Sequence, residues 1–76
     1  MTLAIAHDRH PSTQHFADLF DYEHLPAPLQ GVSAKCHTLA QSMIDELGDG
    51  PELSAGLRSL LQAKDAFVRQ SKKDRG

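Results

Sequence analysis

Positively charged side chains on the stretch 53–70 are the part of this sequence whose types and spacing could bind an anion. The spacing of the apolar residues puts Lys64 near the middle of a helical stripe, with Arg58 and Arg69 along its flank and Asp65 between them. One interpretation is structural. The Lys64 stem then lies along the stripe with its ammonium in water or paired with an acid, and Asp65 pairs with Arg69 on the surface. The other interpretation is that these cations bind a negatively charged ligand.

Tyr22 and Lys35 are two further side chains that could contribute to a ligand site. Tyr22 is the one tyrosine of the chain, and its ring either lies half-buried over a helix end or offers a stacking surface to a flat ligand. Lys35 is the only fixed positive charge between Arg9 and Arg58, and it falls at the border of an apolar helical stripe. That side of the helix is either plain solvent surface or a place where a second chain or a ligand comes close.

Catalytic and metal-binding patterns are not found in the sequence. There is no glycine-rich phosphate loop, no HExxH motif, and no serine or cysteine nucleophile motif. Cys36 and the adjacent His37 point about 100° apart on a helix, so they do not form a dyad, and Cys36 is expected in the core. His7, His10 and His15 are expected to be exposed imidazoles rather than metal ligands. The sequence therefore predicts a protein that is not an enzyme and has no metal or other cofactor.

Two long amphipathic helices must position these side chains, and they are expected over residues 28–47 and 51–70. Their apolar stripes are Leu29, Val32, Cys36, Leu39, Met43 and Leu47 in the first helix, and Leu53, Leu57, Leu60, Leu61, Phe67 and Val68 in the second. The Gly-Asp-Gly-Pro turn between them, in which Asp49 can cap the second helix, is short enough to make the two helices antiparallel neighbours. We therefore predict an all-α fold built on an antiparallel helical hairpin.

The two ends of the chain are expected to differ from this hairpin. Residues 1–11 show no periodicity and predict a loosely ordered arm, followed by a short helix within 12–20 that docks Phe16 and Phe20. Residues 71–76 are polar and charged, and are expected to fray. The predicted organisation is an N-terminal arm with a short helix at 1–21, a helical hairpin domain at 22–70 and a polar C-terminal tail at 71–76.

Size and charge limit the possible functions. With 76 residues and one cysteine, the chain can form a single small core without an internal disulfide. Ile44, Leu61 and Val68 lie off or at the edge of the main stripes, so apolar surface is left over and a homo-oligomer is expected. The net charge is −2 and the one basic segment is 69–76, which argues against a duplex DNA binder. No run is long enough to span a membrane and no basic region precedes the N-terminal apolar run, so a cytosolic protein is expected.

The segment 22–69, YEHLPAPLQGVSAKCHTLAQSMIDELGDGPELSAGLRSLLQAKDAFVR, resembles a known family over about two thirds of the chain. A tyrosine and a Leu-Pro before the first helix, a Leu-Ala within it, the Gly-Pro-Glu turn and the closing LRSLLQAKDAFVR carry the resemblance. The segment is similar to small phage helical-hairpin proteins that sequester cyclic oligonucleotide second messengers. These are the sponge proteins that block CBASS immunity, and they share their hairpin with a class of anti-Thoeris sponges.

The resemblance implies a compact homohexamer that acts without catalysis in the cytoplasm of the host bacterium. It implies binding of cyclic dinucleotides such as 3′,3′-cGAMP between paired subunits, and in some members of cyclic trinucleotides around a three-fold axis. Matched by motif, the first site implies Tyr22 and Lys35, and the second implies Arg69 or Arg58, with Lys64 a further candidate where subunits converge. One tyrosine and one lysine per chain, doubled by a two-fold axis, would supply a π-face for each base and a cation for each phosphate.

Two other functions compete with this hypothesis. A helical-hairpin module that assembles or docks on a larger protein would use Tyr22 and Lys64 for packing and would need no nucleotide. A small DNA-binding regulator is the third candidate, but an antiparallel hairpin leaves no clear recognition helix and only the C-terminal tail is basic.

Overall fold

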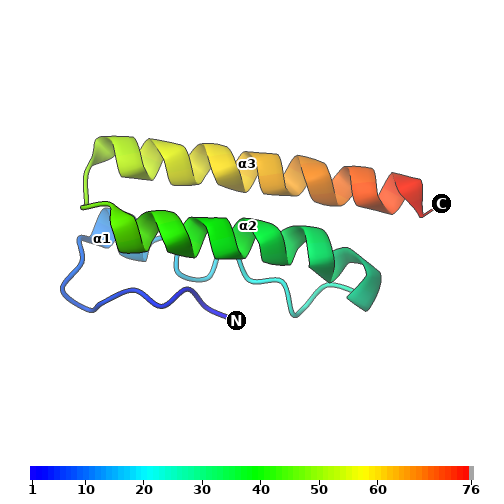
Figure 1. Ribbon diagram of the computed structural model, residues 1–76, viewed down its shortest axis with the longest axis horizontal. Helices are drawn as coiled ribbons and strands as arrows, with labels where there is room; N and C mark the ends of the chain where they lie inside the picture. Colours follow the sequence, from blue (N-terminus) through cyan, green and yellow to red (C-terminus); the bar gives the residue numbers. More distant parts are fainter. Residues whose placement is uncertain (76) are drawn as a thin grey trace.

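The computed structural model describes residues 1–75, and within that range it contains helices and no strand. The helices are α1 (Pro11–Gln14), α2 (Ala27–Glu46) and α3 (Pro51–Asp74). Figure 1 shows α3 running back alongside α2, and the molecule is a rod with extents of 43 × 20 × 17 Å. The prediction of an all-α fold is confirmed.

Prolines and glycines set the ends of the two long helices. The backbone of Pro26 is extended (φ −54°, ψ 144°), and Pro28 then lies in the first turn of α2, where its missing N–H costs no hydrogen bond. The helix ends where Leu47 returns to an extended conformation (φ −112°, ψ 148°). Pro51 is the first residue of α3, so the turn between the helices is only four residues long.

The buried face of α2 is rotated from the predicted stripe. Its buried residues are Leu29, Ser33, Cys36, His37, Ala40 and Ile44. Leu39 and Leu47, which were predicted to face the core, are each 47% exposed, whereas Ile44, which was placed off the stripe, is 1% exposed. The prediction was wrong there because hydrophobic periodicity does not show which apolar residues of α2 are covered by the N-terminal segment.

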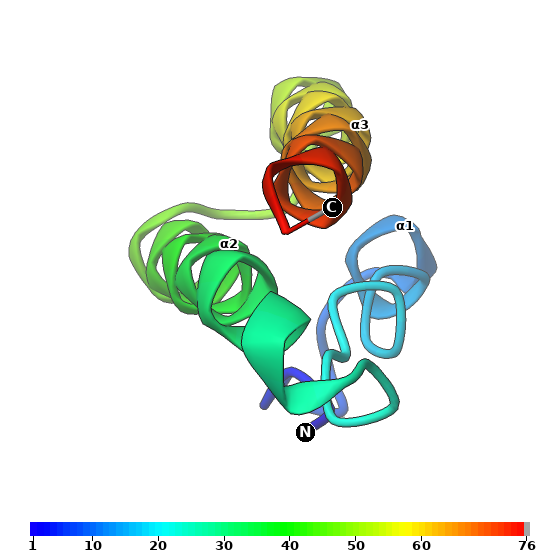
Figure 2. The same cartoon turned by 90° about the vertical axis from the view of Figure 1, so that its right-hand side faces the viewer.

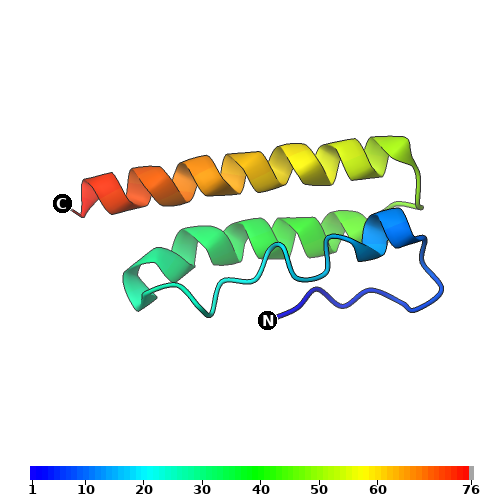
Figure 3. The ribbon, with the colours of Figure 1, turned by 180° about the vertical axis from the view of Figure 1, so that it is seen from behind.

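The N-terminal arm supplies the rest of the cover for α2. Leu3, Phe16 and Phe20 join the side chains of α2 and α3 in one buried cluster, and Figures 2 and 3 show α1 and the arm along one side of the helix pair. The side-chain amide of Gln41 makes two hydrogen bonds to the backbone of Ala4 in the arm. Ala4 N–H donates to Gln41 Oε1 at 2.8 Å, and Gln41 Nε2 donates to Ala4 O at 2.9 Å. The expectation of a loosely ordered arm was therefore wrong, and the short helix expected within 12–20 is a single turn at 11–14.

Helix α3 is longer than predicted and buries a narrower face. Leu53, Leu57 and Val68 are buried, whereas Phe67, which was predicted to lie on the stripe, is 55% exposed. The helix continues to Asp74 rather than ending near residue 70, so the prediction of a frayed tail was wrong for 71–74. An i,i+4 hydrogen bond from Gln70 Nε2 to Asp74 Oδ1 at 2.7 Å supports this extension. The positive charges of Lys72 and Lys73 also stabilise the last turn, because they lie at the negative end of the helix dipole.

A polar clasp joins the arm to the turn between the long helices. Arg9 donates to Asp49 Oδ1 at 2.9 Å and to the carbonyls of Ile44 and Leu47 at 2.8 and 2.9 Å, so it satisfies acceptors that the end of α2 leaves free. Thr13 Oγ1 also donates to Asp49, at 2.6 Å. The prediction that Asp49 caps α3 was wrong, because the residue at the N-cap is Gly50 and no side chain caps that helix.

The clasp changes the acidity of its carboxylate. The hydrogen bonds from the Thr13 hydroxyl and the His10 backbone N–H, together with the Arg9 guanidinium, lower the pKa of Asp49 to about 2. Asp49 is therefore charged over the whole range in which most proteins are studied, and its negative charge is part of the closed clasp.

Candidate functional site

A cleft between the segment that precedes α2 and the C-terminal half of α3 holds two of the four predicted cations, Lys64 and Arg69. We call it the cationic cleft, and its volume is about 260 Å³. It is lined by His24, Leu25, Lys64, Asp65, Val68, Arg69 and Lys72. Three fixed positive charges and one carboxylate line it. Lys64 and Arg69 are about 140° apart around α3, and Lys72 lies between them, so the cleft spans a broad face of the helix. An anion with some apolar surface fits this combination of charge and aliphatic wall.

Lys64 is the most buried of these cations. Its side chain is 13% exposed, and its Nζ lies 3.1 Å from Asp65 Oδ1. Burial raises the pKa of the Cys36 thiol, and the positive charge of Lys64 opposes that rise, so the ammonium also acts on a core residue of α2. Lys64 is thus paired with an acid, as the structural interpretation has it, but the acid is Asp65. Within residues 1–75 no Asp65–Arg69 ion pair forms, which differs from that interpretation.

A second cleft lies on α2 beside Tyr22, and we call it the Tyr22 cleft. Its volume is about 350 Å³, and its lining is Met1, Thr2, Ala4, Tyr22, His37, Thr38, Gln41 and Ser42. The ring of Tyr22 meets that of His37 edge to face, with centroids 5.5 Å apart and an angle of 82° between the planes. Lys35 is not part of this lining. It is exposed and precedes the lining residue Thr38 by three residues, so the two Cβ atoms are about 5–6 Å apart.

His37 gives the Tyr22 cleft an unpaired nitrogen. The residue is 7% exposed, and its Nε2 has no hydrogen-bond partner among the residues that the structure describes. A buried water molecule would satisfy this nitrogen.

Arg58 lies apart from both clefts. Its guanidinium carbon is 5.7 Å from the centre of the Phe16 ring, in the geometry of a cation–π contact. The structure therefore does not bring the five predicted site residues together. Lys64 and Arg69 line one cleft, Tyr22 lines the other, Lys35 lines neither of the two, and Arg58 packs on Phe16.

Sequence reasoning missed three lining residues. Lys72 was assigned to a frayed tail, although its spacing of three from Arg69 would place it on the same side of a longer helix. His37 was considered only as a partner of Cys36. His24 carried no signal, because it stands in an irregular segment whose position depends on tertiary packing.

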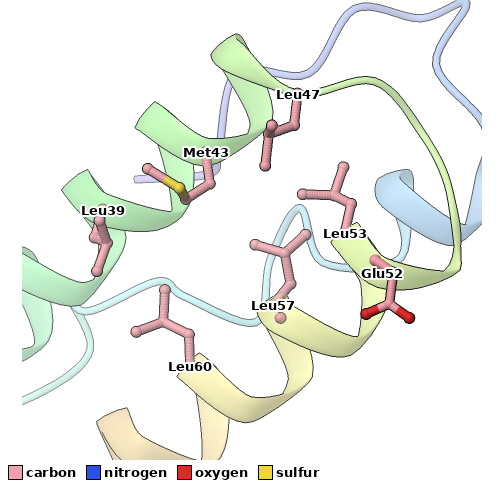
Figure 4. A pocket seen from close by; sticks show the side chains of 8 residues that line it. Leu39, Met43, Leu47, Glu52, Leu53, Leu57 and Leu60 are labelled. Carbon is pink, nitrogen blue, oxygen red and sulfur yellow. The ribbon is translucent and has the colours of Figure 1, made fainter.

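An apolar groove opens between α2 and α3. Its volume is about 220 Å³, and it is lined by Leu39, Met43, Leu47, Glu52, Leu53, Gly56, Leu57 and Leu60. Figure 4 shows the leucine and methionine side chains of α2 directed towards the leucines of α3 across this groove. A ligand that is only apolar, or another helix, would fit this groove, whereas a phosphate would not.

Comparisons with family models, with curated proteins and with solved structures find no match for this chain. No helix within residues 1–75 is both long and apolar enough to cross a membrane. In the same range, no group of three or more histidine, cysteine, aspartate or glutamate side chains is arranged to hold a metal ion.

Proposed function

We propose that this protein binds and sequesters cyclic oligonucleotide second messengers, both cyclic dinucleotides such as 3′,3′-cGAMP and cyclic trinucleotides, and thereby blocks CBASS signalling in the cytoplasm of a phage-infected bacterium. In this proposal it acts by binding alone and is not an enzyme. The observation that carries the proposal is the convergence of Lys64, Arg69 and Lys72 in one cleft with apolar walls. The family resemblance of segment 22–69 supplies the class of ligand.

The charge and size of the cationic cleft both support a phosphate-bearing ligand. Each phosphodiester carries one negative charge, and charge-assisted hydrogen bonds from lysine and arginine are about twice as strong as neutral ones. The cleft of about 260 Å³ is below the roughly 300–1,000 Å³ of pockets that enclose a drug-sized ligand. A cyclic dinucleotide would therefore extend beyond one chain, which favours a site completed by a second subunit.

The Tyr22 cleft supports the same class of ligand in a different way. The ring of Tyr22 offers a surface on which a base stacks, which is worth about 1–3 kcal/mol per base in proteins that bind single strands. Lys35 stands one helical turn before the lining residue Thr38, so its long side chain would supply a cation to a phosphate that projects from the cleft. We include homo-oligomerisation in the proposal, with a hexamer suggested by the resemblance, because two such clefts facing each other would hold both halves of a cyclic dinucleotide.

A thermal-shift screen tests this proposal. Micromolar 3′,3′-cGAMP, other cyclic dinucleotides and cyclic trinucleotides should raise the melting temperature by several degrees, whereas a linear dinucleotide and ATP should have a smaller effect. Ligand recovered after heat denaturation should be intact, because a sponge releases what it bound. If no cyclic nucleotide shifts the melting temperature, the proposal is wrong, and recovery of a cleaved ligand would indicate a phosphodiesterase.

Matched variants separate the two clefts. Arg69→Ala combined with Lys72→Ala should abolish the shift caused by ligands of the cationic cleft, whereas Lys73→Ala, the neighbouring exposed lysine outside the lining, should not. Tyr22→Leu should remove the shift caused by ligands of the Tyr22 cleft.

The Lys64→Met variant is measured for both assembly and ligand binding. Loss of binding with normal assembly would mean that Lys64 contacts the ligand, whereas loss of assembly would mean that Lys64 is a packing residue.

A second candidate function is supported by the apolar groove. A helical module that assembles or docks on another protein, without a nucleotide ligand, would need exposed leucines of the kind found at Leu39 and Leu47. In that case the Tyr22 and Arg69 variants would alter stability or assembly and there would be no nucleotide binding to lose.

A further inference from the structure

A partly exposed apolar strip runs along α2 and α3. It comprises Val32, Leu39, Met43 and Leu47 on α2 with Leu60 and Phe67 on α3, and we call it the open strip. Leu39 and Leu47 are each 47% exposed and Phe67 is 55% exposed. Large side chains left in water along one side of a helix pair are typical of a surface that a partner covers.

Charges beside the open strip indicate what that partner is. Lys35 and Glu46 are both exposed on α2, and neither takes part in an ion pair within residues 1–75. Eleven residues separate them, which is close to three full helical turns, so their side chains point to the same side of α2. By helical position, both lie next to the part of the strip formed by Leu39 and Met43.

The midpoint between the two charges coincides with the middle of the strip. A two-fold axis at the level of Ala40 and Gln41, perpendicular to α2, would set a second copy antiparallel on the first. Lys35 of each chain would then face the partner's Glu46, and the leucines of the two strips would meet between these ion pairs. A surface that is complementary to itself in this way is the property of an isologous interface.

We infer that the open strip binds a second copy of this chain, with the two α2 helices antiparallel and reciprocal Lys35–Glu46 ion pairs across the interface. The inference rests on the proposed function only in that both require a homo-oligomer, and it needs no nucleotide. It gives Lys35 a role at the edge of a subunit interface, in addition to the phosphate contact proposed above.

Charge reversal without ligand tests the pairing, with the dimer dissociation constant measured by sedimentation velocity over a range of concentrations. Lys35→Glu and Glu46→Lys should each weaken self-association at least 10-fold, because each places two pairs of like charges in the interface. An equimolar mixture of the two single variants should associate about as tightly as the unchanged protein, since both heterologous pairs are then attractive. The double variant should likewise recover self-association.

Two further variants complete the experiment. Asp45→Lys makes the same charge change as Glu46→Lys on the adjacent residue, which points about 100° away, and it should leave self-association unchanged. Leu39→Gln, at an exposed position where folding should not suffer, should weaken self-association by at least 10-fold. Circular dichroism confirms that each variant is folded.

Several outcomes would overturn the inference. If the protein stays monomeric at about 100 µM, the inferred interface does not form. Equal weakening by Asp45→Lys and Glu46→Lys would mean that net charge matters and not the pair. A mixture of the single variants that associates no better than each alone would exclude the reciprocal arrangement, even if nucleotide binding were later found.

Discussion

The guanidinium of Arg9 donates its Nε–H to Asp49 Oδ1 at 2.9 Å, across 40 positions of the chain. Its other nitrogens donate to the carbonyl oxygens of Ile44 and Leu47, so one side chain caps the end of α2 and fixes the turn that leads to α3. This clasp explains why the first residues of the chain, which carry no periodic pattern, are part of the fold.

Replacing Arg9 tests the clasp directly. Arg9→Ala leaves two helix-end carbonyls and the Asp49 carboxylate without these donors, and should lower the free energy of unfolding by about 1–3 kcal/mol in urea titrations. Arg9→Lys should give an intermediate loss, because an ammonium cannot reproduce the planar fork of the guanidinium. Equal stability of Arg9→Ala and the unchanged protein would show that the clasp contributes nothing.

The depressed pKa of Asp49 predicts how stability varies with pH. In the folded protein this pKa is about 2, whereas an unfolded aspartate titrates near pH 3.9. The charged carboxylate therefore stabilises the fold above about pH 4, and this contribution falls as the pH is lowered from about 4 towards 2. Asp49→Asn should show a lower stability at neutral pH and a flatter slope between pH 4 and 2. An unchanged slope would assign the acid sensitivity to other carboxylates.

The two neighbouring apolar residues Leu19 and Phe20 offer a matched test of the arm's place in the core. Phe20 is fully buried and Leu19 is 37% exposed. Phe20→Ala should cost about 3–5 kcal/mol, enough to unfold so small a domain, whereas Leu19→Ala should cost less than about 1 kcal/mol. Phe20→Leu, with an expected loss of about 1–2 kcal/mol, keeps the comparison measurable in urea titrations. Similar losses at both positions would show that the arm does not dock in this orientation.

The Cys36 thiol reports on opening of the helix pair. It is 7% exposed, and burial raises its pKa even though Lys64 acts in the opposite direction. Its reaction with a thiol reagent such as DTNB at pH 8 should therefore be slower in the folded protein than in urea, by on the order of 100-fold or more. The measurement is a stopped-flow comparison of the two rates. A native rate close to that of the unfolded chain would place Cys36 at the surface.

Local sequence patterns were sufficient to predict the two long helices. Prolines at positions 28 and 51 and the glycines of the turn gave three of the four helix ends to within one residue. The patterns did not predict the C-terminus of α3. The polar composition of 71–74 is typical of a frayed tail, whereas the i,i+4 hydrogen bond between Gln70 and Asp74 stabilises a helix there.

The rotation of α2 could not be predicted in the same way. Hydrophobic periodicity records which residues are apolar, but the burial of Ile44 in place of Leu47 depends on Leu3, Phe16 and Phe20 from a segment without periodicity.

The candidate site could be predicted only in part. Lys64 and Arg69 share a helix and so could be grouped from the sequence, whereas their neighbour His24 reaches the cleft through a tertiary contact.

The hydrogen bonds that hold the arm have a consequence for the order in which the molecule is assembled. They join Ala4 and Arg9 to residues 35 to 40 positions further along the chain. During synthesis Ala4 and Arg9 have nothing to dock on until α2 and the turn after it have been made. Closing so long a loop costs entropy that only a formed helix pair repays. The arm should thus be the last part to dock during synthesis and the first to exchange its amide hydrogens in the finished protein.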